Sequence, residues 1–206
     1  MALAPGSAEV LRQSGRFAVY MGRFDEGVTA LRRAVVLDPL NPRSHELLGQ
    51  GLFFARQYDE AVAAFTEAVT LTPDDASVHA DAAVHAFRGL AFYELGNLES
   101  ARASCETKPD YWVSELCLAV VSDKLGRHAD AEAVLAKMKL ASGDSASVQY
   151  AEIYAQWGNI PKALEWLDTA VRVHDPGLAF LKTDPLLDPL HTEPRFQAIE
   201  RGLKFP

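Results

Sequence analysis

The sequence has few of the residues that mark secreted, membrane-spanning or metal-binding proteins. It contains two cysteines, Cys105 and Cys117, with neither a CxxC spacing nor a histidine cluster beside them. We interpret both as reduced packing residues, with a disulfide or redox switch as the alternative. No apolar run approaches the roughly 18 residues of a membrane span, and the start, MALAPGSAEV, lacks the regions of a secretory signal. We therefore expect a cytoplasmic chain without a membrane partner.

Motifs of catalysis and cofactor binding are also missing. The six histidines are scattered, and the sequence has no HExxH pair, GxSxG elbow, GxGxxG loop or GxxxxGK[ST] loop. The net charge of −8 argues against nucleic-acid binding, although residues 1–43 carry a net charge of +2 and the remainder −10. We therefore predict no enzyme activity, no metal, no cofactor and no nucleic-acid partner.

The sequence does contain a 34-residue unit that recurs in phase. In the unit at 42–75, small residues, large apolar residues and a terminal proline stand at fixed offsets, namely Gly49, Ala61, Phe65, Ala68 and Pro73. The unit at 8–41 matches these offsets with Gly15, Gly27, Leu31, Ala34 and Pro39. Small residues let two helices cross closely, and large apolar residues at i, i+3 and i+4 fill the remaining groove. This period and these positions resemble the tetratricopeptide repeat (TPR).

The resemblance implies an all-α, right-handed TPR superhelical solenoid of about five helix–turn–helix repeats with a C-terminal capping helical segment. We expect a single domain over 1–206, with repeats at about 8–41, 42–75, 76–111, 112–143 and 144–177 and a cap at 178–206. The third repeat is irregular. We expect its first helix to be lengthened by about two turns from near Asp75, and its second helix to be shortened by Lys108-Pro109-Asp110. Tyr111 and Trp112 are expected to fill the joint that follows.

The C-terminal tail contains four steps in which an acidic residue precedes proline, which favours helix starts. We predict a short helix at 176–182, a turn of helix near 185–190 and a final helix at about 194–203. The tail also resembles the segment that closes TPR regions in bacterial class III adenylate/guanylate cyclases and winged-helix regulators. The matching residues are Leu178, Leu181, Asp184, Pro185, Asp188, Pro189, Leu190, Pro194, Arg195 and Phe196. This implies the C-terminal part of a longer signalling protein.

The TPR resemblance also implies where a partner would bind, because the first helix of each pair lines the concave groove. The groove residues so implied are Arg12, Arg16, Tyr20, Arg43, Glu46, Gln50, Phe53, Phe54, Leu90 and Tyr93. Arginines beside aromatic residues suit an extended peptide that carries a carboxylate. We therefore predict a protein–protein interaction module that binds a peptide or partner helix in this groove.

Two alternatives remain open at this stage. The chain could instead be a regulatory or dimerising C-terminal domain of a bacterial cyclase or transcription regulator, acting as a homodimer, or a small-molecule sensor with a closed pocket. One TPR subfamily is not favoured. TPR domains that clamp the C-terminal carboxylate of chaperones resemble each other in a Lys–Asn–Asn–Lys–Arg set, and the corresponding positions here are Arg12, Arg16, Leu47, Ala83 and Phe87.

Overall fold

The computed structural model describes residues 6–72 and 78–203, and in these ranges the chain is helical and contains no strand. It divides into two compact units, Met1–Cys117 and Leu118–Pro206, with the boundary inside helix α7 (Trp112–Lys124). The prediction of an all-α fold is confirmed. The prediction of one domain over 1–206 stays a prediction. None of the described helices is long and apolar enough to cross a membrane.

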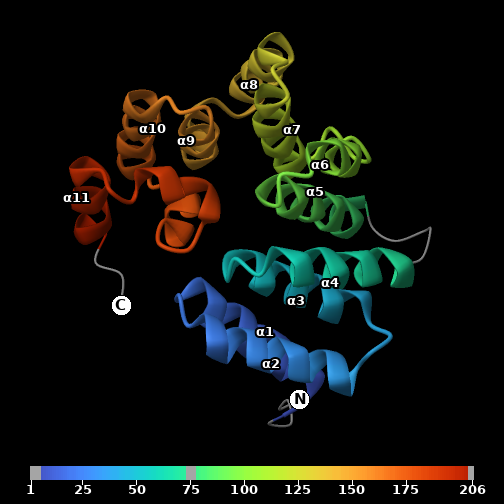
Figure 1. Cartoon of the computed structure of the whole chain (residues 1–206). Helices are drawn as coiled ribbons and strands as arrows, with labels where there is room; N and C mark the ends of the chain where they lie inside the picture. The colour runs from blue at the N-terminus through green and yellow to red at the C-terminus, as the bar shows by residue number, and fades with distance from the viewer. Residues whose placement is uncertain (1–5, 73–77, 204–206) are drawn as a thin grey trace. The chain divides into compact units, whose positions relative to one another are not determined.

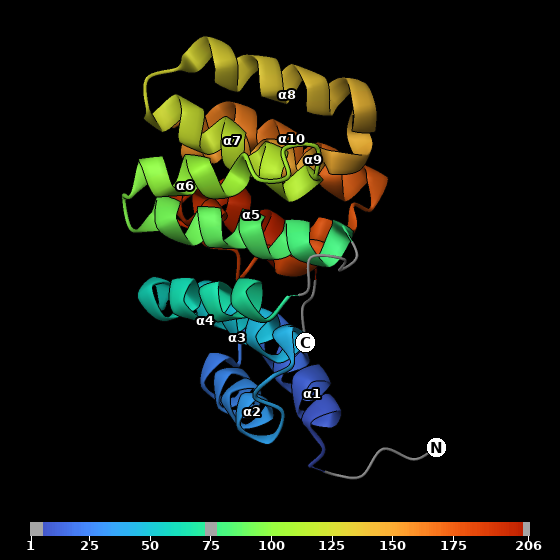
Figure 2. The ribbon, with the colours of Figure 1, turned by 90° about the vertical axis from the view of Figure 1, so that its right-hand side faces the viewer.

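The first unit consists of three helical pairs, each packed on the next (Figure 1 and Figure 2). Contacts between α2 and α3 and between α4 and α5 join the pairs in chain order. The helices are α1 (Ala8–Tyr20), α2 (Phe24–Leu37), α3 (Pro42–Phe54), α4 (Tyr58–Leu71), α5 (Val78–Glu94) and α6 (Leu98–Cys105).

Small residues allow the two helices of a pair to cross closely, as the sequence indicated. A Cβ atom at Gly27 in α2 would lie 2.6 Å from Cγ2 of Val19 and 2.8 Å from the carbonyl oxygen of Gly15, both in α1. No side chain fits such a space without moving a backbone. The neighbouring Leu31 is fully buried in the crossing. The small and large apolar residues of the repeat thus lie where α1 and α2 cross, as the sequence pattern predicted.

A glycine in the left-handed region, the geometry that favours this residue, follows the first helix of four of the described pairs. The φ angles are +73° at Gly22, +74° at Gly96, +78° at Gly126 and +75° at Gly158. The second pair differs, because Arg56 takes the same position with φ of +60°. The first helix of each of these pairs thus ends in a left-handed turn, and at Arg56 a side-chain-bearing residue takes the steric cost.

The third pair is irregular in the described part. Helix α5 has 17 residues against 13 in α1 and in α3, so its described length exceeds theirs by about one turn. Its predicted start near Asp75 lies outside the described residues. Helix α6 has eight residues and ends at Cys105, before the Lys108-Pro109-Asp110 segment, which confirms the predicted shortening.

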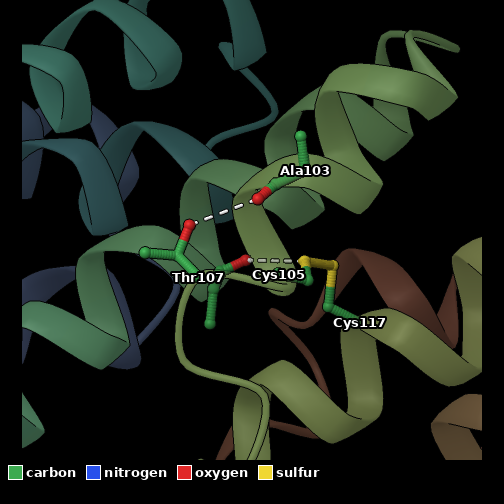
Figure 3. The surroundings of a disulfide bond; sticks show 5 residues. Ala103, Cys105, Thr107 and Cys117 are labelled. Atoms are coloured by element: carbon green, nitrogen blue, oxygen red, sulfur yellow. Dashed lines mark hydrogen bonds between the residues drawn. A yellow bond between two sulfur atoms is a disulfide. The ribbon is translucent and has the colours of Figure 1, made fainter.

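The interpretation of the cysteines as reduced residues was wrong. Cys105 at the end of α6 and Cys117 in α7 form a disulfide, with their Cα atoms 6.1 Å apart (Figure 3). Local spacing gave no sign of this pair, because the two residues are 12 positions apart and meet through helix packing. Their Cα distance is in the range that a disulfide spans. The disulfide, which the sequence analysis gave as the alternative, is therefore the state of the two cysteines in the structure.

The second unit contains α8 (His128–Ser142), α9 (Ser147–Gln156) and α10 (Ile160–Val173), followed by the tail. Its tail elements lie where the sequence predicted them, although the first two are 3₁₀-helices. These are η2 (Pro176–Phe180), η3 (Pro185–Leu190) and α11 (Pro194–Gly202), and a further 3₁₀-helix, η1 (Gly143–Ala146), precedes α9. In each of the three tail elements proline occupies the first turn, where no backbone donor is needed.

Asp175 attaches the tail to the body of the second unit. Its Oδ1 accepts from the backbone N–H of Gly177, and its Oδ2 accepts from that of Val148 at 3.0 Å. The second bond satisfies an N–H in the first turn of α9, whose N-cap residue Ala146 offers no side-chain acceptor. Apolar residues of the tail then complete one core with α9 and α10, namely Leu178, Leu181, Leu187, Leu190 and Phe196.

Candidate functional site

Helices α1 and α3 present a group of charged and aromatic side chains that influence one another. Burial raises the pKa of Tyr20, while the charges of Arg16 and Arg43 lower it and that of Glu46 raises it. These residues come from two successive helical pairs within the first unit. We call the α1–α3 surface the set Arg16, Tyr20, Arg43, Glu46, Gln50 and Phe54.

Glu46 is the buried centre of this surface, with 3% of its area exposed. Its carboxylate pairs with the guanidinium of Arg43, and Oε1 also accepts from Nε2 of Gln50 at 3.2 Å. Burial raises the pKa of Glu46, and the charge of Arg43 partly offsets that effect. Glu46 therefore fixes Arg43 and Gln50 in place, and most of its own surface is not accessible to a partner.

Arg16 is a cation of the α1–α3 surface with unused hydrogen-bonding capacity. Its Nη2 donates to Gln13 Oε1 at 3.0 Å, and Cζ lies 5.9 Å from the centroid of the Tyr20 ring. Within the described ranges no carboxylate pairs with it. A guanidinium has five N–H donors in a planar fork. Arg16 can thus accept a carboxylate in two parallel hydrogen bonds while it stacks on Tyr20.

Aromatic rings link the first helices of the three pairs. Tyr20 of α1 meets Phe54 of α3 edge-on at 6.2 Å, and Phe54 meets Phe87 of α5 at 6.3 Å. Phe87 also contacts Phe53 at 5.8 Å and stacks on Phe65 of α4. Such rings bury large apolar areas and hold fixed relative orientations. The row gives α1, α3 and α5 a continuous aromatic connection.

Several residues predicted for the groove lie in the interior of the unit. Arg12 is 8% exposed and bonds to Glu9, to Asp38 and to Ser44 Oγ at 2.9 Å. The others form part of the hydrophobic core, namely Phe53 and Leu90, each 1% exposed, and Tyr93, 8% exposed. The structure therefore brings together Arg16, Tyr20, Arg43, Glu46, Gln50 and Phe54, although Glu46 and Phe54 (6% exposed) are themselves buried. It places Arg12, Phe53, Leu90 and Tyr93 in the interior.

Two residues near the α1–α3 surface were given another role in the sequence interpretation. Burial raises the pKa of Tyr111, and the charge of Glu46 adds to that effect while the charge of Arg43 opposes it. The adjacent Trp112 contacts the Tyr111 ring at 5.9 Å but is 49% exposed, so it does not fill a joint. Tyr111 directly precedes α7, and Trp112 is the first residue of that helix. No sequence signal placed Tyr111 near Glu46, because that proximity depends on how the third pair packs.

The second unit has a surface groove of about 440 Å³ between α10 and α11. An ion pair between Arg195 and Asp168 lies at its edge, and the remaining lining is apolar, including Val171, Ile199 and Leu203. In the part of the chain that the structure describes, no group of three or more His, Cys, Asp or Glu side chains is arranged to hold a metal ion.

Comparisons with known proteins agree with this geometry. The sequence model of the tetratricopeptide repeat matches residues 12–76. A search of characterised protein sequences finds no significant match. A thermophilic TPR protein of Thermus thermophilus has a similar structure, with a TM-score of 0.66 and 19% identity over 88% of this chain and 99% of that one.

Two further solved structures resemble parts of the chain. The first TPR of Spaghetti (RPAP3), bound to the HSP90 peptide SRMEEVD, has a TM-score of 0.51 and 22% identity over 58% of this chain and 94% of its own. YrrB, described as a TPR protein with an unusual peptide-binding site, has a TM-score of 0.51 and 15% identity, with coverages of 83% and 88%.

At these identities the structural similarity shows the fold alone. The matches do not test the resemblance of the tail to cyclases and winged-helix regulators, which stays a prediction. The match of the family model covers the first two helical pairs, in which the 34-residue period is most regular. Residues 12–76 therefore match the tetratricopeptide repeat family, and the chain has the fold of TPR proteins.

Proposed function

We propose that this chain is a protein–protein interaction module that binds a segment of a partner on the α1–α3 surface. The observation that carries the proposal is Arg16, a guanidinium stacked on Tyr20 with hydrogen-bond donors left over. The function assigned is binding, without a catalytic step. The two solved TPR proteins whose descriptions mention a peptide or a peptide-binding site support this interpretation of the fold.

The chemistry of the surface defines the partner segment. Arg16 suits a carboxylate, which it can bind through two parallel hydrogen bonds. The partly exposed ring of Tyr20, which packs edge-on against the buried ring of Phe54, suits an apolar side chain next to that carboxylate. The amide of Gln50 and the guanidinium of Arg43, both fixed by Glu46, offer donors to backbone carbonyl groups. A segment that combines an acidic and an apolar residue fits this arrangement.

The chaperone-tail clamp is a different arrangement. The clamp resemblance places lysine and asparagine at positions that are here Arg12 and Leu47. Both are buried, and Arg12 is engaged with Glu9, Asp38 and Ser44. We therefore propose an acidic segment bound through Arg16, which differs from the chaperone tails held by that subfamily.

The direct test begins with a random peptide library panned against the full chain. Selected peptides are then titrated by fluorescence anisotropy into the wild type, Arg16→Glu and Arg33→Glu. Arg33 is an exposed arginine of α2 without an ion pair in the described ranges, so it controls for the charge reversal. We expect peptides rich in Asp or Glu beside apolar residues, and a loss of affinity of at least about tenfold for Arg16→Glu alone.

Equal affinities of the two variants, or a library selection without acidic residues, would remove the basis of the proposal. Light scattering of the chain alone, up to high micromolar concentration, separates peptide binding from the homodimer considered as an alternative. A dimer that dissociates in Arg16→Glu but not in Arg33→Glu would assign the same surface to self-association instead.

The cytoplasmic location stays part of the proposal, and the disulfide supplies its test. Cytosolic glutathione and thioredoxin keep most protein thiols reduced, whereas oxidising compartments retain disulfides. Cells are quenched with acid, free thiols are alkylated, and the Cys105–Cys117 peptides are analysed by mass spectrometry. Alkylated cysteines are the expected result for a cytoplasmic protein. A fully oxidised pair in freshly quenched cells contradicts that location.

A further inference from the structure

Helix α5 carries a cation, Arg88, that has no matching anion among the described residues. Arg88 is partly buried, and its Nη2 lies 3.2 Å from Nδ1 of His85, its one hydrogen-bond partner among the described residues. Its Nε atom is buried and has no partner there. No carboxylate in the described ranges pairs with Arg88, and burial lowers the pKa of Arg88. Apart from the contact of Nη2 with His85, the N–H groups of Arg88 have no acceptor in the described part of the chain.

The neighbours of Arg88 along the helix show which sector of α5 it occupies. Phe87 packs its ring on α3 and α4, and Gly89 lies against the Cys105 sulfur of α6. Successive residues of an α-helix are offset by roughly 100° around its axis. Arg88 therefore starts from a third sector of α5, which is neither the one packed on α3 and α4 nor the one packed on α6.

An ordinary packing role does not explain this arrangement. An arginine that only covers apolar surface keeps its polar head in water, whereas here the Nε atom of Arg88 is buried. A buried N–H without an acceptor destabilises a fold, and methionine or leucine would fill the same space without that penalty. Nη1 of Arg88 is not buried and has no acceptor among the described residues. An arginine at this position is thus explained best by a ligand whose acceptor meets this accessible end of the guanidinium.

We propose that Arg88, with His85 beside it, binds an anionic oxygen group of a partner, either a carboxylate or a phosphoryl group. A planar guanidinium holds both groups through paired hydrogen bonds. Position 88 is not one of the chaperone-clamp positions, which Ala83 and Phe87 occupy here. This site is separate from Arg16 and does not rest on the function proposed for the α1–α3 surface.

The test follows the arginine side chains themselves in the full chain. The ¹⁵N–¹H Nε signals are recorded in protein labelled with ¹⁵N-arginine, and the Arg88 signal is identified by its loss in Arg88→Met. Sodium phosphate and sodium acetate are then titrated separately at constant ionic strength. Arg33, exposed and without an ion pair in the described ranges, is the internal reference. We expect a saturable shift of the Arg88 signal and none for Arg33.

Thermal unfolding provides the second measurement. We expect the added anion to raise the melting temperature of the wild type above that of Arg88→Met, and Arg88→Met to be at least as stable as the wild type without the anion. Saturation by phosphate alone identifies a phosphoryl ligand, and saturation by acetate identifies a carboxylate. The inference is overturned if neither anion gives a saturable shift, or if Arg33 responds equally. It is also overturned if Arg88→Met is less stable by the same amount with and without anion.

Discussion

The guanidinium of Arg12 in α1 donates from Nη1 to the hydroxyl oxygen of Ser44 in α3 at 2.9 Å. The same nitrogen lies 3.3 Å from the carboxylate of Asp38, which also accepts from Asn41 at 2.8 Å. Ser44 is fully buried. A residue that the sequence pattern assigned to partner binding thus connects the first helical pair to the second. Its neighbour one turn later, Arg16, forms no ion pair in the described ranges.

Arg12→Ala should therefore reduce stability, whereas Arg16→Ala should not. Loss of Arg12 leaves the buried Ser44 hydroxyl and the Asp38 carboxylate without their partner, which costs about 1–3 kcal/mol. Because Asp38 is partly exposed, we expect the lower half of that range. Arg16→Ala and the control Arg33→Ala should lie within about 0.5 kcal/mol of the wild type. Urea unfolding followed by circular dichroism measures all three, and equal curves for Arg12→Ala and Arg33→Ala would refute the connecting role.

The tail should depend on Asp175. This side chain is 5% exposed and accepts from the backbone of both η2 and α9, at Gly177 and Val148. Substitution of a capping aspartate by alanine typically costs about 0.5–2 kcal/mol, and two backbone donors are involved here. We expect Asp175→Ala to lower the free energy of unfolding by about 2 kcal/mol.

The matched control for Asp175 is Glu132→Ala, which removes an exposed carboxylate of α8 that forms no ion pair in the described ranges. It should leave unfolding by urea unchanged. Limited proteolysis gives a second readout, because a detached tail should be cleaved near 176–190 before the rest of the unit. Resistance of Asp175→Ala to cleavage in this segment would show that the apolar contacts of the tail are sufficient to hold it.

The stability of the second unit should fall as pH rises, because of Glu152. This residue of α9 is 4% exposed. Burial, together with the nearby carboxylates of Asp184 and Asp175, raises the pKa of Glu152 well above its usual range. The folded state therefore holds a proton that the unfolded chain releases near pH ~4.3. The resulting stabilisation is fully present below that pH and is lost as pH rises through the folded pKa.

Glu152→Gln isolates this effect, since the amide is neutral and can still donate a hydrogen bond toward Asp184. The difference in free energy of unfolding between the variant and the wild type should grow in favour of the variant from about pH 5 to about pH 8. Other titrating groups are common to both proteins and cancel in that difference. A difference that stays constant over this pH range would mean that Glu152 is already ionised in the folded protein.

The sequence predicted the pairs of the first unit and the position of each tail helix because those features are local. Glycines at close crossings and prolines after acidic residues determine structure within a few residues of themselves. It could not separate Arg12 from Arg16, which lie four positions apart on one face of the same helix. What separates them is Asp38 and Ser44, contributed by a later turn of the chain. For the same reason the disulfide was only the alternative interpretation of the two cysteines, and the cap that Asp175 gives to α9 was not predicted, since both join separate segments of the chain.

Reduction of the disulfide should destabilise the first unit. Cross-linking Cys105 to Cys117 closes a loop over a separation of 12 residues. Closure of a loop of roughly this length stabilises a fold by about 2–4 kcal/mol. Urea unfolding of the wild type should thus shift to lower urea with added reductant, whereas the double variant Cys105→Ala with Cys117→Ala should not respond. A wild-type curve that reductant does not move would show that the bond is absent in solution.

Arg56 offers a substitution that should increase stability. It holds the left-handed turn of the second pair with φ of +60°, where the corresponding residues of the other described turns are glycines. The left-handed region costs a side-chain-bearing residue about 1–2 kcal/mol, and a glycine at this position avoids that cost. The larger conformational entropy of glycine in the unfolded chain offsets part of the stabilisation. Arg56 also donates to the carbonyl of Phe54 at 3.1 Å, a bond that the substitution removes. We therefore expect Arg56→Gly to raise the free energy of unfolding by up to about 1 kcal/mol.

Arg23→Gly is the appropriate control for Arg56→Gly. Arg23 lies in the equivalent loop of the first pair, but its φ is −87°, so glycine relieves no strain there. Arg23→Gly should be neutral or less stable than the wild type, because its one effect on the backbone is to raise the conformational entropy of the unfolded chain. Both are compared with the wild type by urea unfolding at one pH. If Arg56→Gly proves no more stable than Arg23→Gly, the contacts of the Arg56 side chain outweigh the strain of its backbone.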